Sequence, residues 1–208
     1  MGKVLIIGAG KVGRTLLDIL EQRKHKIWVV EEQREVCNEL ASEKSASVVH
    51  GDATDPTVLD EMDLQGMDYV FAVSTSDEAN FLAGAYCKQA GSKRVICRVN
   101  SIKHSQILEK MGIESVVSEL TLASELANRV SSPVIYKLLN PIESKMEFVE
   151  KDADESGFVG KSINEIEKNN FLIIAIYNNG KYSLAKDIER IPKDSKLVIL
   201  RETGLKLF

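Results

Sequence analysis

Cysteine and histidine are scarce in this sequence, and neither is spaced for a metal site or a disulfide framework. The three cysteines, Cys37, Cys87 and Cys97, lie far apart and form no C-x-x-C pair, which argues against a zinc cluster and against a stapled secreted fold. The three histidines are also widely separated, without the spacing of metal ligands. We therefore expect small core cysteines in a reducing compartment, and histidines that are solvated or structural.

Long hydrophobic runs and blocks of like charge are missing as well. No apolar stretch approaches the ~20 residues that cross a bilayer, and because strand-like sequence begins at Lys3 we expect no signal peptide. The net charge is −4 with no Lys/Arg block to offset it, so an extended nucleic-acid surface is not expected. We expect a cytoplasmic protein that does not insert into a membrane and reaches one only through a partner.

The sequence is organised around its first thirty residues, where a strand, a glycine turn and a helix follow one another. The run Lys3–Ile7 is apolar and β-branched, as in a strand buried on both faces. It leads into the G-x-G-x-x-G pattern Gly8-Ala9-Gly10-Lys11-Val12-Gly13, followed by apolar residues at helical spacing. We expect Gly8 to permit a tight turn, Gly10 to let a pyrophosphate approach the backbone, and Gly13 to let the helix pack closely on the strand.

A carboxylate at the end of the second strand completes a nucleotide-binding pattern. The buried run Ile27–Val30 ends at Glu31, about twenty residues past the glycines, where an acid can accept hydrogen bonds from both hydroxyls of an adenosine ribose. The same charge repels a 2′-phosphate, so NAD is expected rather than NADP. In this setting the pattern predicts a dinucleotide- or nucleotide-binding fold. The alternative is a βαβ unit whose glycines serve only packing.

Strands and helices alternate without a break as far as residue 130. The expected strands after the second cover residues 47–50, 68–73, 94–97 and 115–117, and the expected helices cover 34–44, a segment opening at Pro56, 77–89, 103–111 and 119–130. This rhythm predicts an α/β fold with a Rossmann-like, doubly wound parallel sheet. In the last helix we expect Leu122, Leu126 and Val130 to face inward. Ser131-Ser132-Pro133 breaks the pattern and closes a first domain of residues 1–133.

Residues 134–208 have a different pattern, which predicts a linker followed by a smaller α+β domain. Ser162 to Glu165 is a capping box that opens a short helix, and Asn179-Gly180 is typical of a hairpin turn. The expected strands cover residues 145–150, 171–177 and 196–201. This module holds no histidine and no nucleophile beside a base, so it offers no obvious catalytic site.

Polar side chains follow several of the expected strands, on the edge where open α/β sheets bind ligands. Asp52 lies in the turn Gly51-Asp52-Ala53-Thr54, where it either accepts from an adenine or ribose or only forms the turn. The hydroxyl residues Ser74, Thr75 and Ser76 follow the fourth strand and can cap the next helix while facing phosphates. Asn80 is a further candidate, which either reaches the ligand or is a surface amide at a helix start. Arg98 is another, which either binds a phosphate or an interface partner or is a simple surface charge.

Together these features resemble the regulator of potassium conductance (RCK) family, in particular the TrkA/KtrA-type cytosolic subunits of potassium uptake systems. The resemblance covers nearly the whole chain. The segments that carry it are Ile6–Arg14, Gly51–Thr54, Ala72–Asn80, Arg98–Asn100, Gly157–Ile166, Ile173–Ile176 and Lys196–Leu200.

The resemblance implies a regulatory subunit, not an enzyme, that docks on a membrane potassium transporter or channel subunit and changes its gating with bound nucleotide. The implied ligand is ATP or ADP, or NADH or NAD, held by the glycine turn, including Ala9, Lys11 and Val12, and by Glu31. Glu119 matches a position where some relatives place a divalent cation between copies. The second domain resembles one that pairs into dimers and in some relatives binds cyclic di-AMP. Such subunits are homo-oligomers (dimer, tetramer or octameric ring) on the inner face of the cell membrane.

Two other functions stay open on the sequence. An NAD-dependent oxidoreductase would need a positioned acid or base beside the nicotinamide. A free-standing cytosolic nucleotide sensor would carry the same sequence features and bind another partner. The preferred nucleotide, the number of copies and the direction of regulation are open at this stage.

Overall fold

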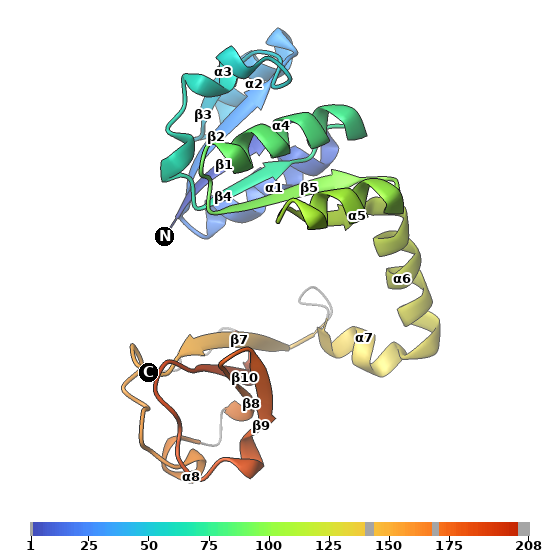
Figure 1. The fold of residues 1–208 in the computed structure, drawn as a ribbon. Helices are drawn as coiled ribbons and strands as arrows, with labels where there is room; N and C mark the ends of the chain where they lie inside the picture. Colours follow the sequence, from blue (N-terminus) through green and yellow to red (C-terminus); the bar gives the residue numbers. More distant parts are fainter. Residues whose placement is uncertain (1, 140–143, 168–170, 204–208) are drawn as a thin grey trace. The chain divides into compact units, whose positions relative to one another are not determined.

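The computed structural model describes residues 2–139, 144–167 and 171–203, and the chain divides into two units, Met1–Ser124 and Glu125–Phe208 (Figure 1). The domain boundary predicted after residue 133 stays a prediction. Within the described ranges, no helix is both long enough and apolar enough to cross a membrane.

The first unit is built on a six-stranded parallel sheet in the order β3-β2-β1-β4-β5-β6, which confirms the predicted doubly wound fold. The strands are β1 Lys3–Ile7, β2 Lys26–Glu31, β3 Ser47–His50, β4 Tyr69–Ala72, β5 Arg94–Val99 and β6 Glu114–Val117. β1 pairs with β2 on one side and β4 on the other, so the strand order reverses at β1. Ligands of open α/β sheets bind outside the carboxyl ends of the strands at such a reversal.

Helices cover both faces of this sheet. They are α1 Lys11–Gln22, α2 Arg34–Glu43, α3 Pro56–Asp60, α4 Asp77–Gln89 and α5 Ile102–Lys110, with a 3-10 turn η1 at Leu64–Gly66. Alternate residues of β1 serve two cores, because successive side chains of a strand point to opposite faces. Val4 belongs to a core with Leu17 of α1 and Leu40 of α2, whereas Leu5 belongs to a core with buried residues of α3, α4 and α5. The apolar run of β1 is therefore covered on both sides, as predicted.

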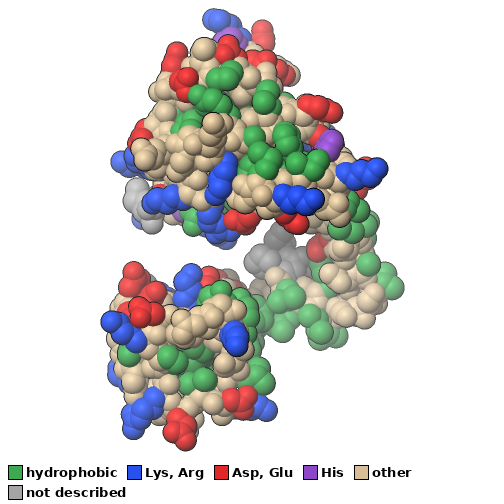
Figure 2. Space-filling model, viewed as in Figure 1, with side chains coloured by type: hydrophobic (Ala, Val, Ile, Leu, Met, Phe, Trp, Pro, Cys, Tyr) green, Lys and Arg blue, Asp and Glu red, His purple; other side chains and the backbone are tan. Residues whose placement is uncertain are grey.

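Helix α6 (Ser118–Ser131) differs from the sequence expectation in its burial. The predicted inward-facing residues Leu122, Leu126 and Val130 are 61%, 56% and 84% exposed, and α6, which lies wholly within the described residues, buries no side chain. The prediction that they face a core was wrong, because a helical repeat shows that one face is apolar but not what covers it. Helix α7 (Pro133–Leu139) is likewise unburied, and hydrophobic side chains gather over both helices in Figure 2.

The second unit carries a four-stranded antiparallel sheet in the order β7-β10-β8-β9, which confirms the smaller α+β domain. Its elements are β7 Met146–Asp152, α8 Ile163–Ile166, β8 Phe171–Asn178, β9 Lys181–Leu184, a 3-10 turn η2 at Ala185–Asp187, and β10 Lys196–Glu202. The predicted hairpin joins β8 to β9, with positive φ at Asn179 and Gly180. This is the conformation that two-residue hairpin turns require. The predicted capping box of Ser162 and Glu165 is present. The second unit has a hydrophobic core of its own.

The packing of α4 on β5 generates a stability prediction. A Cβ added at Gly84 of α4 would lie 2.3 Å from Sγ of Cys97 on β5. We expect Gly84→Ala to lower the free energy of unfolding by about 1–3 kcal/mol, the usual cost of overpacking a filled core, as measured by urea unfolding. Because Cys97→Ala removes the clashing sulfur, the double variant should lose less stability than the two single losses added together. Strict additivity would contradict this contact.

Candidate functional site

The carboxyl ends of strands β1 to β5 surround a crevice made of two adjoining pockets. The pockets share Gly8, Glu31, Glu32, Ser74 and Thr75 in their linings, and the larger has a volume of about 480 Å³. Most of the sequence-predicted binding residues line one pocket or both: Gly8, Ala9, Gly10, Lys11, Val12, Glu31, Asp52, Ala53, Thr54, Ser74, Thr75, Ser76 and Arg98. The fold thus brings together residues that the sequence scatters over five strand ends, at the edge where this fold binds ligands.

The glycines of the turn between β1 and α1 have distinct geometric roles. Gly8 has a φ of +92°, and a Cβ there would lie 2.8 Å from Cα of Ser74. A Cβ on Gly13 would lie 2.0 Å from the carbonyl oxygen of Gly8, so α1 packs against the turn itself. Among the described residues, no atom lies within 4 Å of the Cβ position of Gly10, which leaves the backbone open to an approaching group. Gly10 is also the N-cap of α1, where the helix dipole and amide groups favour an anion.

Glu31 joins the end of β2 to the glycine turn. It is 7% exposed, and its carboxylate oxygens accept hydrogen bonds from the backbone N–H of Ala9 at 2.6 Å and of Gln33 at 2.9 Å. Its carbonyl oxygen accepts from the N–H of Gly51 at 2.9 Å, which ties β2 to the turn after β3. Each carboxylate oxygen has a further lone pair, so Glu31 keeps acceptor capacity in the crevice it lines. The predicted hydrogen bonds to ribose hydroxyls stay a prediction.

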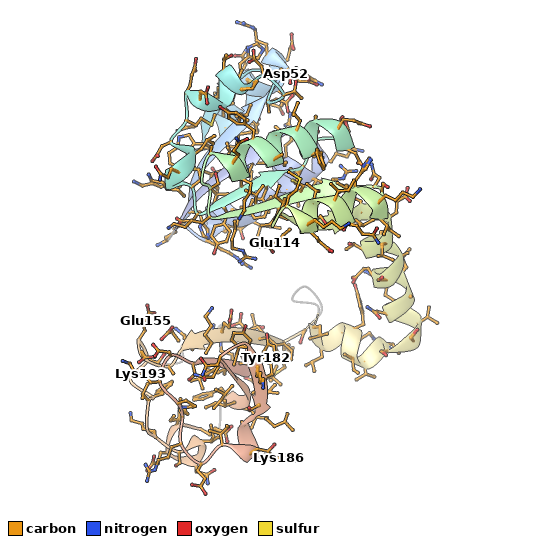
Figure 3. All side chains as sticks on the ribbon, in the orientation of Figure 1. Asp52, Glu114, Glu155, Tyr182, Lys186 and Lys193 are labelled. Carbon is orange, nitrogen blue, oxygen red and sulfur yellow. The ribbon has the colours of Figure 1, made fainter. Side chains whose placement is uncertain are left out.

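Asp52 forms a turn and lines the crevice at the same time. One carboxylate oxygen, Oδ1, accepts from both the N–H and the hydroxyl of Thr54 at 2.8 Å, which is an Asx turn. Asp52, Ala53 and Thr54 all line the smaller pocket, and Figure 3 shows Asp52 far across the first unit from Glu114. The two alternatives read from the sequence are therefore compatible, because the turn needs only one of the two carboxylate oxygens.

Asn80 holds the loop after β4 and lies outside both pocket linings. Its side chain is 1% exposed. The side-chain oxygen accepts from the N–H of Ser74 at 2.8 Å, and the amide nitrogen donates to the carbonyl oxygens of Ser74 at 3.0 Å and Arg98 at 2.9 Å. Asn80 thereby fixes the loop and the end of β5 relative to each other. Its predicted contact with a ligand stays a prediction. Ser76 caps α4, as expected, by accepting from the N–H of Ala79.

Carboxylates line both pockets of the crevice, whereas cations are found only in the described lining of the larger one. The smaller pocket is lined by the carboxylates Glu31, Glu32 and Asp52, with no cation among its described lining residues. The larger pocket shares Glu31 and Glu32 with the smaller one and adds two cations, Lys11 and Arg98, beside the glycine turn. Carboxylates accept hydrogen bonds from sugar hydroxyls, whereas Lys and Arg bind phosphate. The charge pattern therefore suits a ligand with a sugar at one end and phosphates at the other.

The three cysteines are unsuited to chemistry. All are free and buried, as the sequence predicts. Burial raises the pKa of Cys37, with a contribution from the charge of Glu31, and burial raises the pKa of Cys87 and of Cys97 to about 12. Since the thiolate is the reactive form, these thiols are inert core groups.

Asp77 links the start of α4 to the turn after β5. Burial opposes ionisation of this carboxyl, but hydrogen bonds from the backbone N–H of Asn100 and Ser101 and from the His104 ring outweigh it and hold the pKa of Asp77 below its usual range. The ring nitrogen Nδ1 of His104 lies 3.0 Å from Oδ2. His104 is thus structural, as expected for a histidine outside any metal-ligand pattern.

Glu119, the predicted metal ligand, is exposed in the first turn of α6. Across the part of the chain that the structure describes, no three His, Cys, Asp or Glu side chains are grouped to hold a metal ion. A cation at Glu119 would need ligands from another copy of the chain, and this site stays a prediction.

Eight lining residues were not predicted from the sequence. Four of them, Ile7, Val30, Gly51 and Val73, lie at strand ends, and the other four, Glu32, Gln33, Val36 and Ala79, lie beyond them. Glu32 and Gln33 follow Glu31 directly, and the other two lie in the first turns of α2 and α4. A usable signal exists, because the first turn of each helix that follows a parallel strand starts at the same edge of the sheet. Applying that rule to every strand end would have found the last four.

A parallel sheet with a glycine turn, an acid on β2 and a separate small domain defines a Rossmann-like α/β protein with a second α+β unit. The TrkA-N domain family model matches residues 4–119. The chain belongs to the TrkA-N family. A relative named Trk system potassium uptake protein TrkA homolog, from Methanothermobacter thermautotrophicus, is 29% identical over 202 residues, covering 96% of this chain and 94% of the relative. The homolog from Pyrococcus abyssi is 30% identical, covering 97% and 92%.

Some relatives are longer than this chain. A TrkA homolog from Methanosarcina mazei is 30% identical over 95% of this chain, which spans only 45% of that relative. Among solved structures, GsuK bound to ADP is 25% identical with a TM-score of 0.56, covering 63% of this chain and 35% of GsuK. The GsuK channel bound to NAD has a TM-score of 0.52 at 20% identity, covering 98% and 38%, and this likeness shows the fold.

The glycine turn generates a prediction with an internal control. Gly13→Ala must push the Gly8 carbonyl away, so we expect the free energy of unfolding to fall by about 1–3 kcal/mol or more. Gly10→Ala meets open space and changes only the N-cap residue of α1, so its loss should stay below about 1 kcal/mol. Urea unfolding of both variants checks the difference. Equal losses would show that Gly13 has no special packing role.

Proposed function

We propose that this chain is a regulatory subunit of a membrane potassium transporter or channel, and that an adenine nucleotide bound in the crevice sets its state. The observation that carries the proposal is the arrangement of charge around the glycine turn, in a chain that belongs to the TrkA-N family. The Trk relatives are named for potassium uptake, and GsuK is a channel solved with NAD and with ADP. Attachment to a transporter would place the subunit at the inner face of the membrane.

The proposed orientation of the ligand follows from the two ends of the crevice. The ribose of the adenosine would lie at Glu31 and near Asp52, where carboxylates can accept from its hydroxyls. Its phosphates would lie over Gly10, at the N-terminus of α1, with Lys11 and Arg98 beside them. Both NAD or NADH and ATP or ADP satisfy this pattern. Glu31 and the exposed Glu32 together disfavour a 2′-phosphate, which makes NADP the poorer ligand.

Binding without catalysis is the function that the lining residues favour. Hydride transfer would need an acid or base held beside the nicotinamide. The ionisable side chains of the described linings are Glu31, Glu32, Asp52, Lys11 and Arg98. The proposed orientation places them beside the ribose and the phosphates. A regulator needs only different affinities for two conformations, since a ligand that binds one better shifts the population toward it. We therefore place this chain among regulators rather than oxidoreductases.

Self-association through α6 and α7 is part of the proposal. Large contiguous apolar surfaces on a soluble chain mark interaction sites, and Leu122, Leu126, Val130 and Val134 are all more than half exposed. Several copies are also what a gating subunit requires, because force on a transporter comes from relative motion between copies. We propose a homo-oligomer in which Glu119 meets a divalent cation between copies.

The second unit offers a separate site for an effector. A pocket of about 360 Å³ lies there between α8, β8 and η2. Its lining includes Ser162, Asn164 and Lys186, the last labelled in Figure 3, together with the carboxylates Glu167 and Glu189. Hydroxyl, amide and ammonium groups of this kind bind phosphates. Cyclic di-AMP is accordingly included among the ligands to be tested.

A ligand panel tests the central proposal. The chain is melted with ATP, ADP, NAD, NADH, NADP and cyclic di-AMP, and affinities are measured by calorimetry. A ligand at one hundred times its Kd stabilises the folded state by about 2.7 kcal/mol. We expect this stabilisation for an adenine nucleotide pair without a 2′-phosphate, either ATP and ADP or NAD and NADH, and not for NADP. Lys11→Gln should bind about tenfold more weakly, because it loses a charged phosphate contact. Lys103→Gln, on the surface of α5, is the matched control and should bind normally.

Each result that would contradict the proposal points to a different alternative. Absence of binding at millimolar concentration would show that the crevice is not a nucleotide site. Binding of cyclic di-AMP alone would move the regulatory site to the second unit. Steady hydride transfer from bound NADH to a substrate would favour an oxidoreductase, and co-purification with a soluble partner in place of a membrane protein would favour a free-standing sensor.

The apolar face of α6 generates a prediction about assembly. Replacing both Leu122 and Leu126 by Asp puts charges on that face, so we expect the oligomer to dissociate to a 23.1 kDa monomer in light scattering after size exclusion. Ile19→Asp on α1, whose side chain is 45% exposed, is the matched control and should leave the assembly intact. An unchanged mass in the double variant would show that this face does not hold copies together.

A further inference from the structure

Arg98 stands at the junction between the crevice and helix α6. It lies near the end of β5 and lines the larger pocket. Its inner nitrogen Nε donates a hydrogen bond to Oγ of Ser118 at 2.8 Å. Ser118 is the first residue of α6 and belongs to neither pocket lining. A single guanidinium therefore contacts both the space for a ligand and the base of a helix outside that space.

The geometry of the guanidinium determines what this hydrogen bond leaves free. An arginine carries five N–H donors in one fixed plane, one on Nε and four on the two terminal nitrogens. The bond to Ser118 uses the Nε donor and fixes the plane of the group. The four outer donors are then not needed for Ser118, and they can meet a phosphate from a side chain that already lines the pocket. A preorganised arginine loses less rotamer freedom on binding than a freely rotating one.

The backbone of Arg98 is joined to the opposite wall of the crevice. Its carbonyl oxygen accepts from the Asn80 amide, and the same Asn80 side chain is bonded to both the N–H and the carbonyl of Ser74. Ser74 in turn packs directly against Gly8 of the glycine turn. A continuous series of contacts thus links the glycine turn to Ser118, by way of Ser74, Asn80 and Arg98. Such a contiguous network is the physical requirement for coupling between a site and a distant element.

Helix α6 is the element at the end of this network, and it is weakly anchored. Its 14 residues begin in the first unit and end in the second, because the division falls after Ser124. α6 buries none of its side chains in this chain, and the Ser118 hydroxyl is bonded to Arg98 at the first residue of the helix. Segments with few buried contacts open locally at low free-energy cost, so their order responds to one bond.

We propose that Ser118 is a positioning residue that aims the Arg98 guanidinium at the phosphate end of the crevice, and that this hydrogen bond couples ligand binding to the order of the first turn of α6. The inference deepens the proposed function and rests on it, since it requires a phosphate-bearing ligand in the larger pocket. A ligand held on the outer nitrogens fixes the plane of the guanidinium and so keeps Nε directed at Ser118, because the group is rigid and planar. Linkage makes the effect reciprocal: whatever orders Ser118 tightens ligand binding, and the ligand orders Ser118.

The test uses the full chain, with ATP and NAD as the two probes. Ser118→Ala removes the acceptor without touching a lining residue, and we expect it to weaken binding of the better probe by about two- to tenfold, the effect of freeing one long side chain. Ser118→Thr keeps a hydroxyl and should restore wild-type affinity. Ser131→Ala removes a hydroxyl at the other end of α6, where it donates to the Ala127 carbonyl, and should bind as wild type does.

A double-mutant cycle separates positioning from a general structural effect. Arg98→Ala should weaken binding more than Ser118→Ala does, and Arg98→Ala combined with Ser118→Ala should bind no more weakly than Arg98→Ala alone, because Ser118 acts only through the arginine. Amide hydrogen exchange over residues 118–124 provides the second readout. The probe should slow exchange there about two- to tenfold in wild type and Ser118→Thr, by the same linkage factor, and should leave it unchanged in Ser118→Ala. A thermal melt of each variant verifies that it is folded.

The possible outcomes distinguish failure of the Ser118 role from failure of the proposed function. If the wild type binds a probe, but Ser118→Ala binds it equally well and the probe still slows exchange at α6, the positioning role of Ser118 is wrong and the proposed function stands. Additive losses in the double variant would also overturn the positioning role. If the wild type binds neither probe, the proposed function fails, and this inference fails with it.

Discussion

The buried carboxylate of Glu31 is the interaction on which the crevice depends. Burial of an ionised carboxylate is unfavourable unless hydrogen bonds replace water, and here the backbone N–H groups of Ala9 and Gln33 do so. The consequence is geometric, because the glycine turn, the end of β2 and the start of α2 must keep one relative position. A glycine turn is flexible by nature, and this carboxylate makes it a fixed surface against which phosphates can be placed.

A rigid crevice beside a weakly held helix is an arrangement suited to regulation. The sheet has a core on each face, and its central strand is buried from Val4 to Ile7, so the strand ends that form the site move little. Helix α6 has no such core. Conformational change therefore costs least at α6, where the fold is least packed. A ligand that changes one contact there can shift the population of α6 conformations, whereas the packed sheet resists the same change.

Enzymes and regulators on this fold differ in what surrounds the nucleotide. A dehydrogenase surrounds the nicotinamide with a substrate site and a proton donor. In this chain the second unit has its own sheet and core. One of the two cations beside the glycine turn, Arg98, donates a hydrogen bond to the first residue of α6. The site is thus connected to an element that leaves the domain, which is what transmission of a binding event requires.

The sequence by itself determined the β1–turn–α1 unit, the acid at Glu31, the strand and helix alternation, and the hairpin at Asn179-Gly180, because each is a local pattern in which spacing alone decides the conformation. Tertiary structure decided the rest. Asn80 has the sequence of a surface residue at a helix start, yet it is buried, because strand order brings the end of β5 beside the loop after β4. Leu122 and Leu126 have the sequence of core residues, yet they are exposed. Periodicity shows which face of a helix or strand is apolar. Which elements contact that face depends on the order of the strands in the assembled sheet, which the periodicity does not contain.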